Sequence, residues 1–251
     1  AVVVAADGTG YGPDGTVWGG EVLDVTLADF ERVGGLDTFC LPGGETAVEY
    51  PARTLAALLD ETALVDDRLV ETGAVETQTD AAVVRQQAAQ GVNAPEPTSA
   101  GRVLDAAAAL EGACDRRRYE GEPAQRLEAL ASRGDAREVR LRFGRNDGRP
   151  VLDVRALLAS LDSLDAPAAD VAATAQDALA RGLGTIAVEA ARDRGREAVG
   201  FTGGVAYNDA ISRRLRETVE NEGLTFLSHD RIPPGDGGIA YGQAVVASAR
   251  Q

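Results

Sequence analysis

Residues 1–12 read AVVVAADGTGYG, an apolar and β-branched run that ends in a glycine-rich turn. The three consecutive valines predict a buried strand, and the glycines after them predict a polar loop at its end. The same order returns late in the chain, where apolar residues 198–201 precede TGG at 202–204 and residues 224–227 precede PPGDGG at 233–238. A helix-forming stretch follows each of these two loops. Strand, loop and helix repeated in this way predict an α/β sheet whose loops lie at one edge.

The chain between these loops alternates between strand-forming and helix-forming segments. Residues 47–90 are rich in helix formers and lack a strong strand signal, which predicts a helical insertion. Charged and apolar residues alternate over 138–143, which predicts one strand of a hairpin with residues 151–154. The glycines of Gly182-Leu183-Gly184 predict a break between two helices within residues 168–194. Further strands are expected at 16–25 and 32–41, a connector at 93–98, and helices at 98–108, 122–131, 208–220 and 239–249.

The composition indicates an ordinary globular core under a strongly acidic surface. With 251 residues, 44% of them hydrophobic, the chain can form one large domain or two closely paired lobes. Its 40 acidic residues outnumber 25 basic ones, all of them Arg, and the net charge is −15. Such a surface repels nucleic acid and anionic membranes, so neither is expected as a partner. It suits concentrated salt and indicates a halophilic source, with an acidic mesophilic protein as the alternative.

Cysteine usage and the absence of targeting segments point to a cytoplasmic protein. Cys40 and Cys114 are far apart and lack CxxC spacing, so we expect them to be buried as small apolar residues in a reducing compartment. No apolar run approaches the length of a membrane span, and no signal peptide is recognisable. The chain contains no methionine and opens directly on a strand. We therefore expect it to begin inside a longer protein.

The three glycine-rich loops are candidate phosphate-binding segments. Glycine lets backbone amides approach a phosphate closely, and a helix that follows adds its positive end. Two of the loops also carry a carboxylate, Asp7 and Asp236, which could hold Mg²⁺ or another hard cation beside ATP phosphates. Each loop also has a plain structural explanation, because glycine turns a strand into a helix and Asp stabilises a turn through its own loop amides. The residue pattern alone leaves both explanations open.

Longer motifs help to decide between a phosphate-binding role and a purely structural role for these loops. Residues 7–21, DGTGYGPDGTVWGGE, closely resemble the DGTGxGxDGTxWGGE motif of HypF carbamoyltransferases. Further segments resemble that family in the same order along the chain, so the resemblance covers nearly all of it. They are LPGGE at 41–45, TSAGRVLDA at 98–106, YEGE at 119–122, TGGVAYN at 202–208 and PPGDGGIA at 233–240.

The resemblance implies the C-terminal carbamoyltransferase domain of that family, which is similar to the ATPase that makes threonylcarbamoyl-adenosine in tRNA. The implied fold is α/β, the two-lobed actin and sugar-kinase-like (ASKHA) ATPase fold, here truncated at its N-terminus and carrying a helical insertion. On this basis residues 1–46 are expected to be part of the first lobe, and residues 47–97 the insertion. Residues 98–251 would then form the remainder, including the second lobe.

The resemblance also implies site residues around ATP bound between the lobes. Asp7 and Asp236 are expected to be catalytic and to bind a divalent metal, which could be Mg, Mn, Fe or Zn. The expected nucleotide contacts are Gly203, Gly204 and Asn208 at the adenosine, Asp105 and Gly121 at the ribose, and Gly8, Thr9 and Gly10 at the phosphates.

The activity that the resemblance implies is carbamoyl transfer in [NiFe]-hydrogenase maturation. Another domain would make carbamoyl-adenylate from carbamoyl phosphate and ATP, and this domain would pass the carbamoyl group to the C-terminal cysteine of a HypE-type acceptor, for cyanide ligand synthesis. Family members carry a histidine-rich motif just upstream of the DGTG stretch, whereas the single histidine here is His229. The alternatives are therefore a catalytically silent nucleotide- or partner-binding module, or a relative of the tRNA threonylcarbamoyl-adenosine ATPase or of the sugar and acetate kinases.

Overall fold

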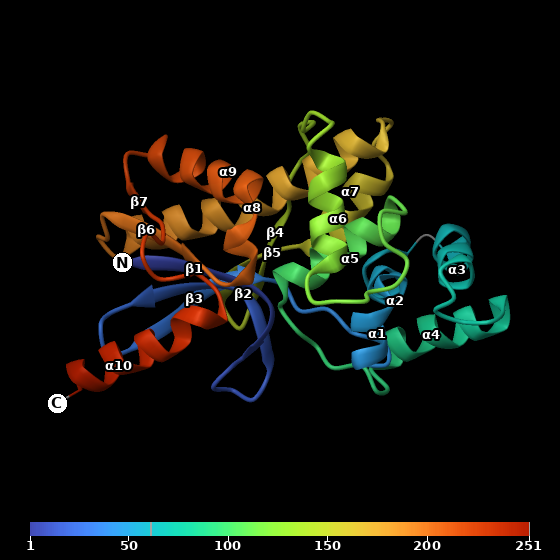
Figure 1. Cartoon of the computed structure of the whole chain (residues 1–251), viewed down its shortest axis with the longest axis horizontal. Coiled ribbons are helices and arrows are strands. Elements are labelled where there is room, and N and C mark those ends of the chain that lie inside the picture. The colour runs from blue at the N-terminus through green and yellow to red at the C-terminus, as the bar shows by residue number, and fades with distance from the viewer. Residues whose placement is uncertain (61, 251) are drawn as a thin grey trace.

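A mixed sheet runs through the described residues in the order β4-β5-β3-β2-β1-β6-β7 (Figure 1). The structure is a computed structural model, and it describes residues 1–60 and 62–250. The sheet joins segments that are far apart in the sequence, because β1 pairs with β6. The strands are β1 (Val2–Tyr11), β2 (Val17–Val25), β3 (Phe30–Leu36), β4 (Phe143–Asn146), β5 (Arg149–Leu152), β6 (Ala198–Thr202) and β7 (Thr225–Leu227).

The opening strand lies near the middle of the sheet. β1 runs antiparallel to β2 and parallel to β6, and the side chains of Val2, Val4 and Ala6 are buried. The buried strand that the valines predict is therefore confirmed. The strand also continues through the glycine-rich stretch to Tyr11, with an irregularity in its pairing between Ala6 and Gly10. What the glycines predicted as a free loop is thus a distorted far half of β1.

Helices cover the sheet and form a second group beside it (Figure 1). The helical composition of residues 47–90 is confirmed by α1 to α4, of which α2 packs against α5. The helices are α1 (Glu45–Glu49), α2 (Pro51–Leu58), α3 (Thr62–Glu71), α4 (Gln78–Gln90), α5 (Ala100–Leu110), α6 (Glu122–Ala131), α7 (Val154–Asp162), α8 (Ala168–Asp193), α9 (Asp209–Glu220) and α10 (Ile239–Ala249), with 3₁₀ turns η1 (Gly204–Tyr207) and η2 (Asp236–Gly238).

The predicted break near Gly182 is wrong, because α8 is one continuous helix of 26 residues. It contacts β1, β2, β3, β5 and β6. A Cβ on Gly182 would overlap the Leu152 side chain, and a Cβ on Gly184 would lie 2.9 Å from Leu215 Cδ1 and from Thr218 Cγ2. The glycines therefore let α8 approach β5 and α9 closely, and they do not interrupt it.

The predicted hairpin exists, but its strands are shifted along the chain. β4 begins only at Phe143, and its turn consists of Asp147 and Gly148, at φ values of 48° and 77°. A two-residue turn with both φ angles positive fixes the pairing of the residues on either side of it, here Asn146 with Arg149. Residues 138–142 lie outside the strand for that reason. β3 likewise covers 30–36, where the sequence predicted 32–41.

Strands from both ends of the chain share the one sheet. β1 to β3 come from the first 36 residues, and β6 and β7 come from residues 198–227. The expected boundary near residue 46 therefore separates strands from helices along the chain and does not separate two sheets. The assignment of residues 1–46 and 98–251 to two lobes stays a prediction.

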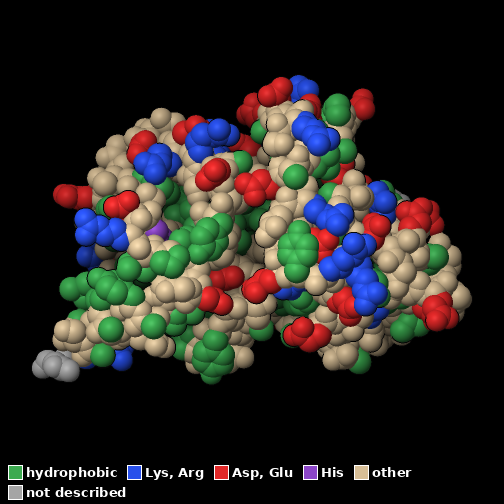
Figure 2. All heavy atoms as spheres, in the orientation of Figure 1, with side chains coloured by type: hydrophobic (Ala, Val, Ile, Leu, Met, Phe, Trp, Pro, Cys, Tyr) green, Lys and Arg blue, Asp and Glu red, His purple; other side chains and the backbone are tan. Residues whose placement is uncertain are grey.

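The last helix differs from the others in its surroundings. α10 is rich in Ala, Val and other apolar residues, yet none of its residues is buried, and Ile239 and Tyr241 are more than half exposed. Hydrophobic side chains accordingly gather on the surface over α10 (Figure 2). No helix in residues 1–60 and 62–250 combines the length and the apolarity that crossing a membrane requires.

Candidate functional site

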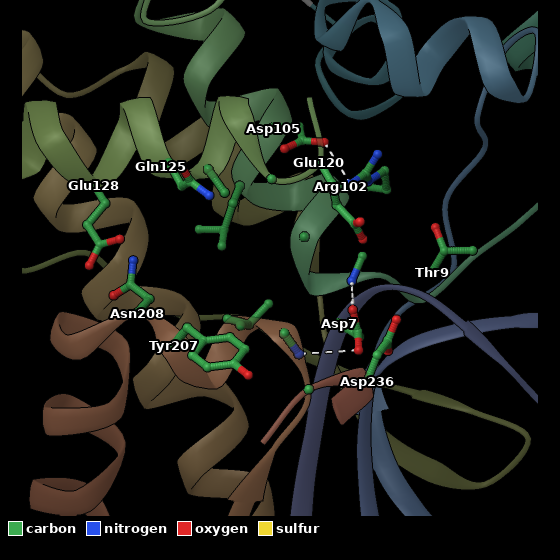
Figure 3. Close-up of a pocket in the computed structure, with 18 of the residues that line it drawn as sticks. Asp7, Thr9, Arg102, Asp105, Glu120, Gln125, Glu128, Tyr207, Asn208 and Asp236 are labelled. Atoms are coloured by element: carbon green, nitrogen blue, oxygen red, sulfur yellow. Dashed lines mark hydrogen bonds and ion pairs between the residues drawn. The ribbon is translucent and has the colours of Figure 1, made fainter. Parts of the chain in front are cut away.

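A cavity of about 680 Å³ lies where the far half of β1 meets α5, α6, η1 and the loop before α10 (Figure 3). Most of the residues that the sequence proposed for the site come together here although they are distant in sequence. Those on its wall are Asp7, Gly8, Thr9, Asp105, Gly121, Gly204, Asn208 and Asp236. Gly10 and Gly203 are not among the lining residues.

These two glycines hold backbone segments together behind the wall. Gly10 pairs with Trp18 across β1 and β2, and a Cβ on it would lie 3.0 Å from the Trp18 carbonyl oxygen. Gly203 has a φ of 97°, a Cβ on it would overlap the Ala6 carbonyl, and its N–H donates to Pro234 O at 2.9 Å. Gly203 therefore joins the end of β6 to β1 and to the loop before α10.

The Asp7 carboxylate connects two of the glycine-rich segments. Its Oδ1 accepts a hydrogen bond from the Gly8 N–H at 2.6 Å, and its Oδ2 accepts one from the Gly204 N–H at 3.2 Å. Asp236 comes from the third segment, lines the same cavity, and is drawn at the same end of it as Asp7 (Figure 3). The two carboxylates that the sequence singled out therefore lie together.

The N-terminus of α5 holds the β1 loop in place. Ser99 caps this helix by accepting a hydrogen bond from the Arg102 N–H at 3.1 Å, and its hydroxyl donates to Gly8 O at 2.6 Å. Gly101 permits the close approach, because a Cβ on it would lie 2.8 Å from Gly8 Cα. The SAGR segment thus fixes the position of the loop that carries Asp7.

One turn further along α5, a buried ion pair lines the cavity. Arg102 Nη2 lies 3.1 Å from Asp105 Oδ2, and both side chains are almost completely buried. Burial raises the pKa of Asp105 to about 6, against the opposing effect of Arg102 and Arg117. Arg102 Nε and Nη1 have no hydrogen-bond partner in the described part of the chain. Arg102 and Arg117 both line the cavity, although neither is among the site residues that the sequence predicted.

The opposite end of the cavity is formed by α6 and the start of α9. Asn208 caps α9, and its Oδ1 accepts a hydrogen bond from the Ile211 N–H at 2.9 Å. Gln125 and Glu128 of α6 also line this end, and neither is among the site residues that the sequence predicted. Their spacing was a usable signal, because four and seven residues after Gly121 fall on the same helix face as the start of α6.

The charged groups fit only some metals. Among the described residues no three His, Cys, Asp or Glu side chains form a metal-binding group. His229 does not line the cavity, and its Nε2 lies 3.0 Å from Thr202 Oγ1. Two neighbouring carboxylates suit a hard cation such as Mg²⁺ or Mn²⁺, which takes its other ligands from water and phosphate. They do not provide the nitrogen and sulfur ligands typical of structural Zn²⁺ sites.

Comparison with protein families identifies the chain. Residues 3–243 match the family model described as the carbamoyltransferase, Kae1-like domain, second subdomain, of HypF. The chain is 36% identical over 98% of its length to the probable carbamoyltransferase HypF of Methanocaldococcus jannaschii. It is 39% identical over 99% of its length to the carbamoyltransferase HypF of Rhodobacter capsulatus. It spans 32% of each of these two relatives.

Solved structures agree with the sequence relatives. A crystal structure of full-length HypF in a phosphate- and nucleotide-bound form matches the whole chain with a TM-score of 0.87 and 29% identity. The crystal structure of T. kodakarensis HypF matches it with a TM-score of 0.86 and 37% identity. The chain covers 33% and 34% of those two proteins. The mixed α/β sheet expected for an ASKHA-type fold is confirmed by these matches. The chain therefore belongs to the HypF carbamoyltransferase family, through the second subdomain of the Kae1-like domain.

Proposed function

We propose that this chain forms the nucleotide-binding part of a carbamoyltransferase that acts in [NiFe]-hydrogenase maturation. The donor would be carbamoyl-adenylate, made elsewhere from carbamoyl phosphate and ATP, and the acceptor would be the C-terminal cysteine of a HypE-type protein in the cytoplasm. Family membership supports carbamoyl transfer, since the relatives named above are carbamoyltransferases. The related structure that is described as phosphate- and nucleotide-bound supports a nucleotide as ligand.

The observation that carries the proposal is the meeting of three glycine-rich segments in one cavity. Gly8 and Thr9 lie beside Asp7 and Asp236 at one end, and Asn208 lies at the other (Figure 3). The proposed nucleotide therefore places its phosphates beside Gly8 and Thr9, its ribose beside Asp105 and Gly121, and its base beside Asn208. A volume of about 680 Å³ lies within the usual range for small-molecule sites.

The proposed reaction transfers a carbonyl carbon from an adenylate phosphate oxygen to a thiolate sulfur. Negative charge grows on the carbamoyl oxygen as the sulfur attacks, and positively charged or N–H groups near that oxygen lower the barrier. Arg102 and Arg117 are the guanidinium groups that line the cavity. Their charge would also compensate the phosphate of the donor.

Asp7 and Asp236 are the residues that would hold a divalent cation. When bound, such a cation supplies charge neutralisation at the phosphates and polarisation of the carbonyl group. Both Asp7 oxygens already accept one backbone N–H each, but a carboxylate has about four lone-pair sites, so each oxygen retains acceptor capacity. The carboxylate of Asp7 would therefore fix the loops and bind the cation together.

Calorimetric titration of ATP with and without Mg²⁺ tests the proposal. We expect saturable binding that Mg²⁺ strengthens, and about tenfold weaker binding in Asn208→Ser, which keeps a helix cap but loses the amide donor. Asp236→Asn should abolish the strengthening by Mg²⁺, whereas Asp230→Asn, an exposed carboxylate just outside the loop, should leave it intact. Equal affinity of wild type and Asn208→Ser, together with equal Mg²⁺ response of both Asp variants, would contradict the assigned site.

A further inference from the structure

The end of the cavity away from Asp7 contains side chains for which the family motifs offer no role. Gln125 and Glu128 project from α6 toward Asn208, at the start of α9 (Figure 3). Asp7, Thr9 and Asp236 occupy the other end of the same view. If the phosphates lie beside Asp7, as proposed above, the nucleobase reaches Glu128 and Asn208.

The cavity wall offers both apolar and polar surface, which suits a flat ring with a polar edge. Leu104, Ala124 and Val205 contribute apolar surface to the cavity, and Tyr207 adds an aromatic side chain. Such groups cover the faces of a purine and leave its edge to be read by polar atoms. Polar atoms at this end belong chiefly to Asn208, Gln125 and Glu128.

The hydrogen-bonding capacity of two of these side chains is restricted. Asn208 Oδ1 is occupied by the Ile211 N–H, so its Nδ2 is the group left to contact a ligand, and Nδ2 is a donor. The Glu128 carboxylate accepts hydrogen bonds and donates none when it is ionised. It already accepts the backbone N–H of Asp209, which leaves further lone pairs. The edge of the base thus meets an acceptor and a donor.

We propose that Glu128 accepts a hydrogen bond from the 6-amino group of a purine while Asn208 donates to a neighbouring ring nitrogen. Adenine presents the 6-amino group beside the ring acceptor N7, whereas a 6-oxopurine presents two acceptors there. A carbonyl oxygen facing the Glu128 carboxylate would leave both acceptors without a donor. The cavity would therefore select 6-aminopurine nucleotides over 6-oxopurine nucleotides. This inference rests on the proposed nucleotide site and names its specificity.

A purely structural role for Glu128 is the competing explanation. Its hydrogen bond to Asp209 stabilises the first turn of α9, and that function alone would account for the side chain. The substitution Glu128→Gln separates the two roles. Its amide oxygen can still accept the Asp209 N–H, while its amide nitrogen adds a donor that suits a 6-oxo group. A structural role affects all nucleotides alike, whereas base reading changes their ratio.

The test compares the Kd values of ATP and ITP, which differ at position 6 of the base. We expect the wild-type chain to bind ATP about 10- to 100-fold more tightly than ITP. Glu128→Gln should weaken ATP and strengthen ITP, so that this ratio falls about tenfold or more. Glu189→Gln, an exposed glutamate on α8, is the matched control and should keep the wild-type ratio.

The possible outcomes separate base reading by Glu128 from the existence of the nucleotide site. Equal binding of ATP and ITP by the wild type, or an unchanged ratio in Glu128→Gln, would overturn base reading by Glu128 and leave the nucleotide site standing. Failure of the wild type to bind either nucleotide would overturn the site as well as the inference. A reduced ratio in Glu128→Gln but not in Glu189→Gln would support it.

Discussion

At the scale of single residues, Asp105 is the most unusual ionisable group of the cavity. Its carboxyl group is enclosed on α5, and the attraction of Arg102 only partly offsets the loss of hydration, so its pKa is raised to about 6. An unfolded chain releases this proton at a lower pH than the folded chain does. Between those two pKa values the folded state therefore binds more protons, and folding loses stability as the pH rises.

Replacing Asp105 by Asn should change how the free energy of unfolding depends on pH. The substitution itself changes stability by an amount that does not depend on pH, and the variant lacks the Asp105 titration. From about pH 5 to about pH 8 the free energy of unfolding of the variant should gain about 1 to 2 kcal/mol relative to wild type. Urea unfolding at a series of pH values measures the difference.

The variant Asp24→Asn is the control, because its effect on stability should change with pH in the opposite direction. Hydrogen bonds from Arg196 at 2.9 and 3.0 Å lower the pKa of Asp24, so its stabilising effect is lost as the pH falls. The penalty of Asp24→Asn should therefore shrink toward acidic pH, while that of Asp105→Asn should grow. A pH-independent difference for Asp105→Asn would mean that Asp105 titrates alike in the folded and unfolded chain.

The motifs predicted the residues of the site better than they predicted its electrostatics. Asp7, Asn208 and Asp236 could be named because glycine-rich loops and family motifs are local in sequence. Arg102 belongs to one of those motifs, but its importance depends on burial, which results from α5 packing against β1. Gln125 and Glu128 become recognisable only when α6 and the start of α9 are known to face one cavity.

At the scale of elements, α8 shows how packing overrides helix propensity. Glycine in a helix costs about 1 kcal/mol relative to alanine, which is why two glycines close together predicted a break. α8 nevertheless remains continuous, since the absence of a Cβ at Gly182 lets Leu152 of β5 lie directly against the helix. Local propensity contains no information about that neighbour.

The replacement Gly182→Ala should destabilise the protein even though alanine is the better helix former. The added methyl group overlaps the Leu152 side chain, and overpacking of this kind costs about 1 to 3 kcal/mol. Gly242→Ala in α10 is the matched comparison, because nothing lies within 4 Å of the added Cβ. That variant should gain up to about 1 kcal/mol. Chemical denaturation measures whether each substitution raises or lowers the free energy of unfolding. Stabilisation by Gly182→Ala would refute the packing argument.

Elements were predictable where their signals are local. The strands beside the glycine-rich loops and the helices of residues 47–90 follow from periodicity and composition. The hairpin of β4 and β5 lies further along the chain than predicted, because its turn has only two residues. These are Asp147 and Gly148, which both have positive φ angles. The pairing of β1 with β6 joins residues almost two hundred positions apart, and no local pattern specifies it.

At the scale of the whole molecule, charge repulsion competes with ion pairing. The net charge of −15 favours expansion, while the ion pairs of the described residues all join Arg to Asp or Glu and lie mostly at the surface. Surface pairs contribute little each, so screening of the excess negative charge should dominate. The halophilic source proposed from composition depends on this balance.

The melting temperature should therefore rise with salt. Between about 0.1 M and about 2 M KCl we expect an increase of about 5 °C or more, because the screening length falls from about 10 Å to below 3 Å. Differential scanning calorimetry measures the change, with glycine betaine at equal osmolality as a solute that does not screen. A melting temperature that falls in KCl would show that ion pairs outweigh repulsion and would remove the argument for a halophilic protein.

The central place of β1 in the sheet has a consequence for synthesis of the chain. β1 leaves the ribosome before β6, which lies beside it, and before the Asp236 segment, both of which follow about 200 residues later. At ordinary translation rates this interval is about 10 to 40 s. During that time the edge of β1 that pairs with β6 lacks this strand, and its N–H and C=O groups lack their partners in β6. Nascent chains of this protein should therefore depend on chaperones until β6 and the Asp236 segment appear, and a nucleotide cannot stabilise them before then.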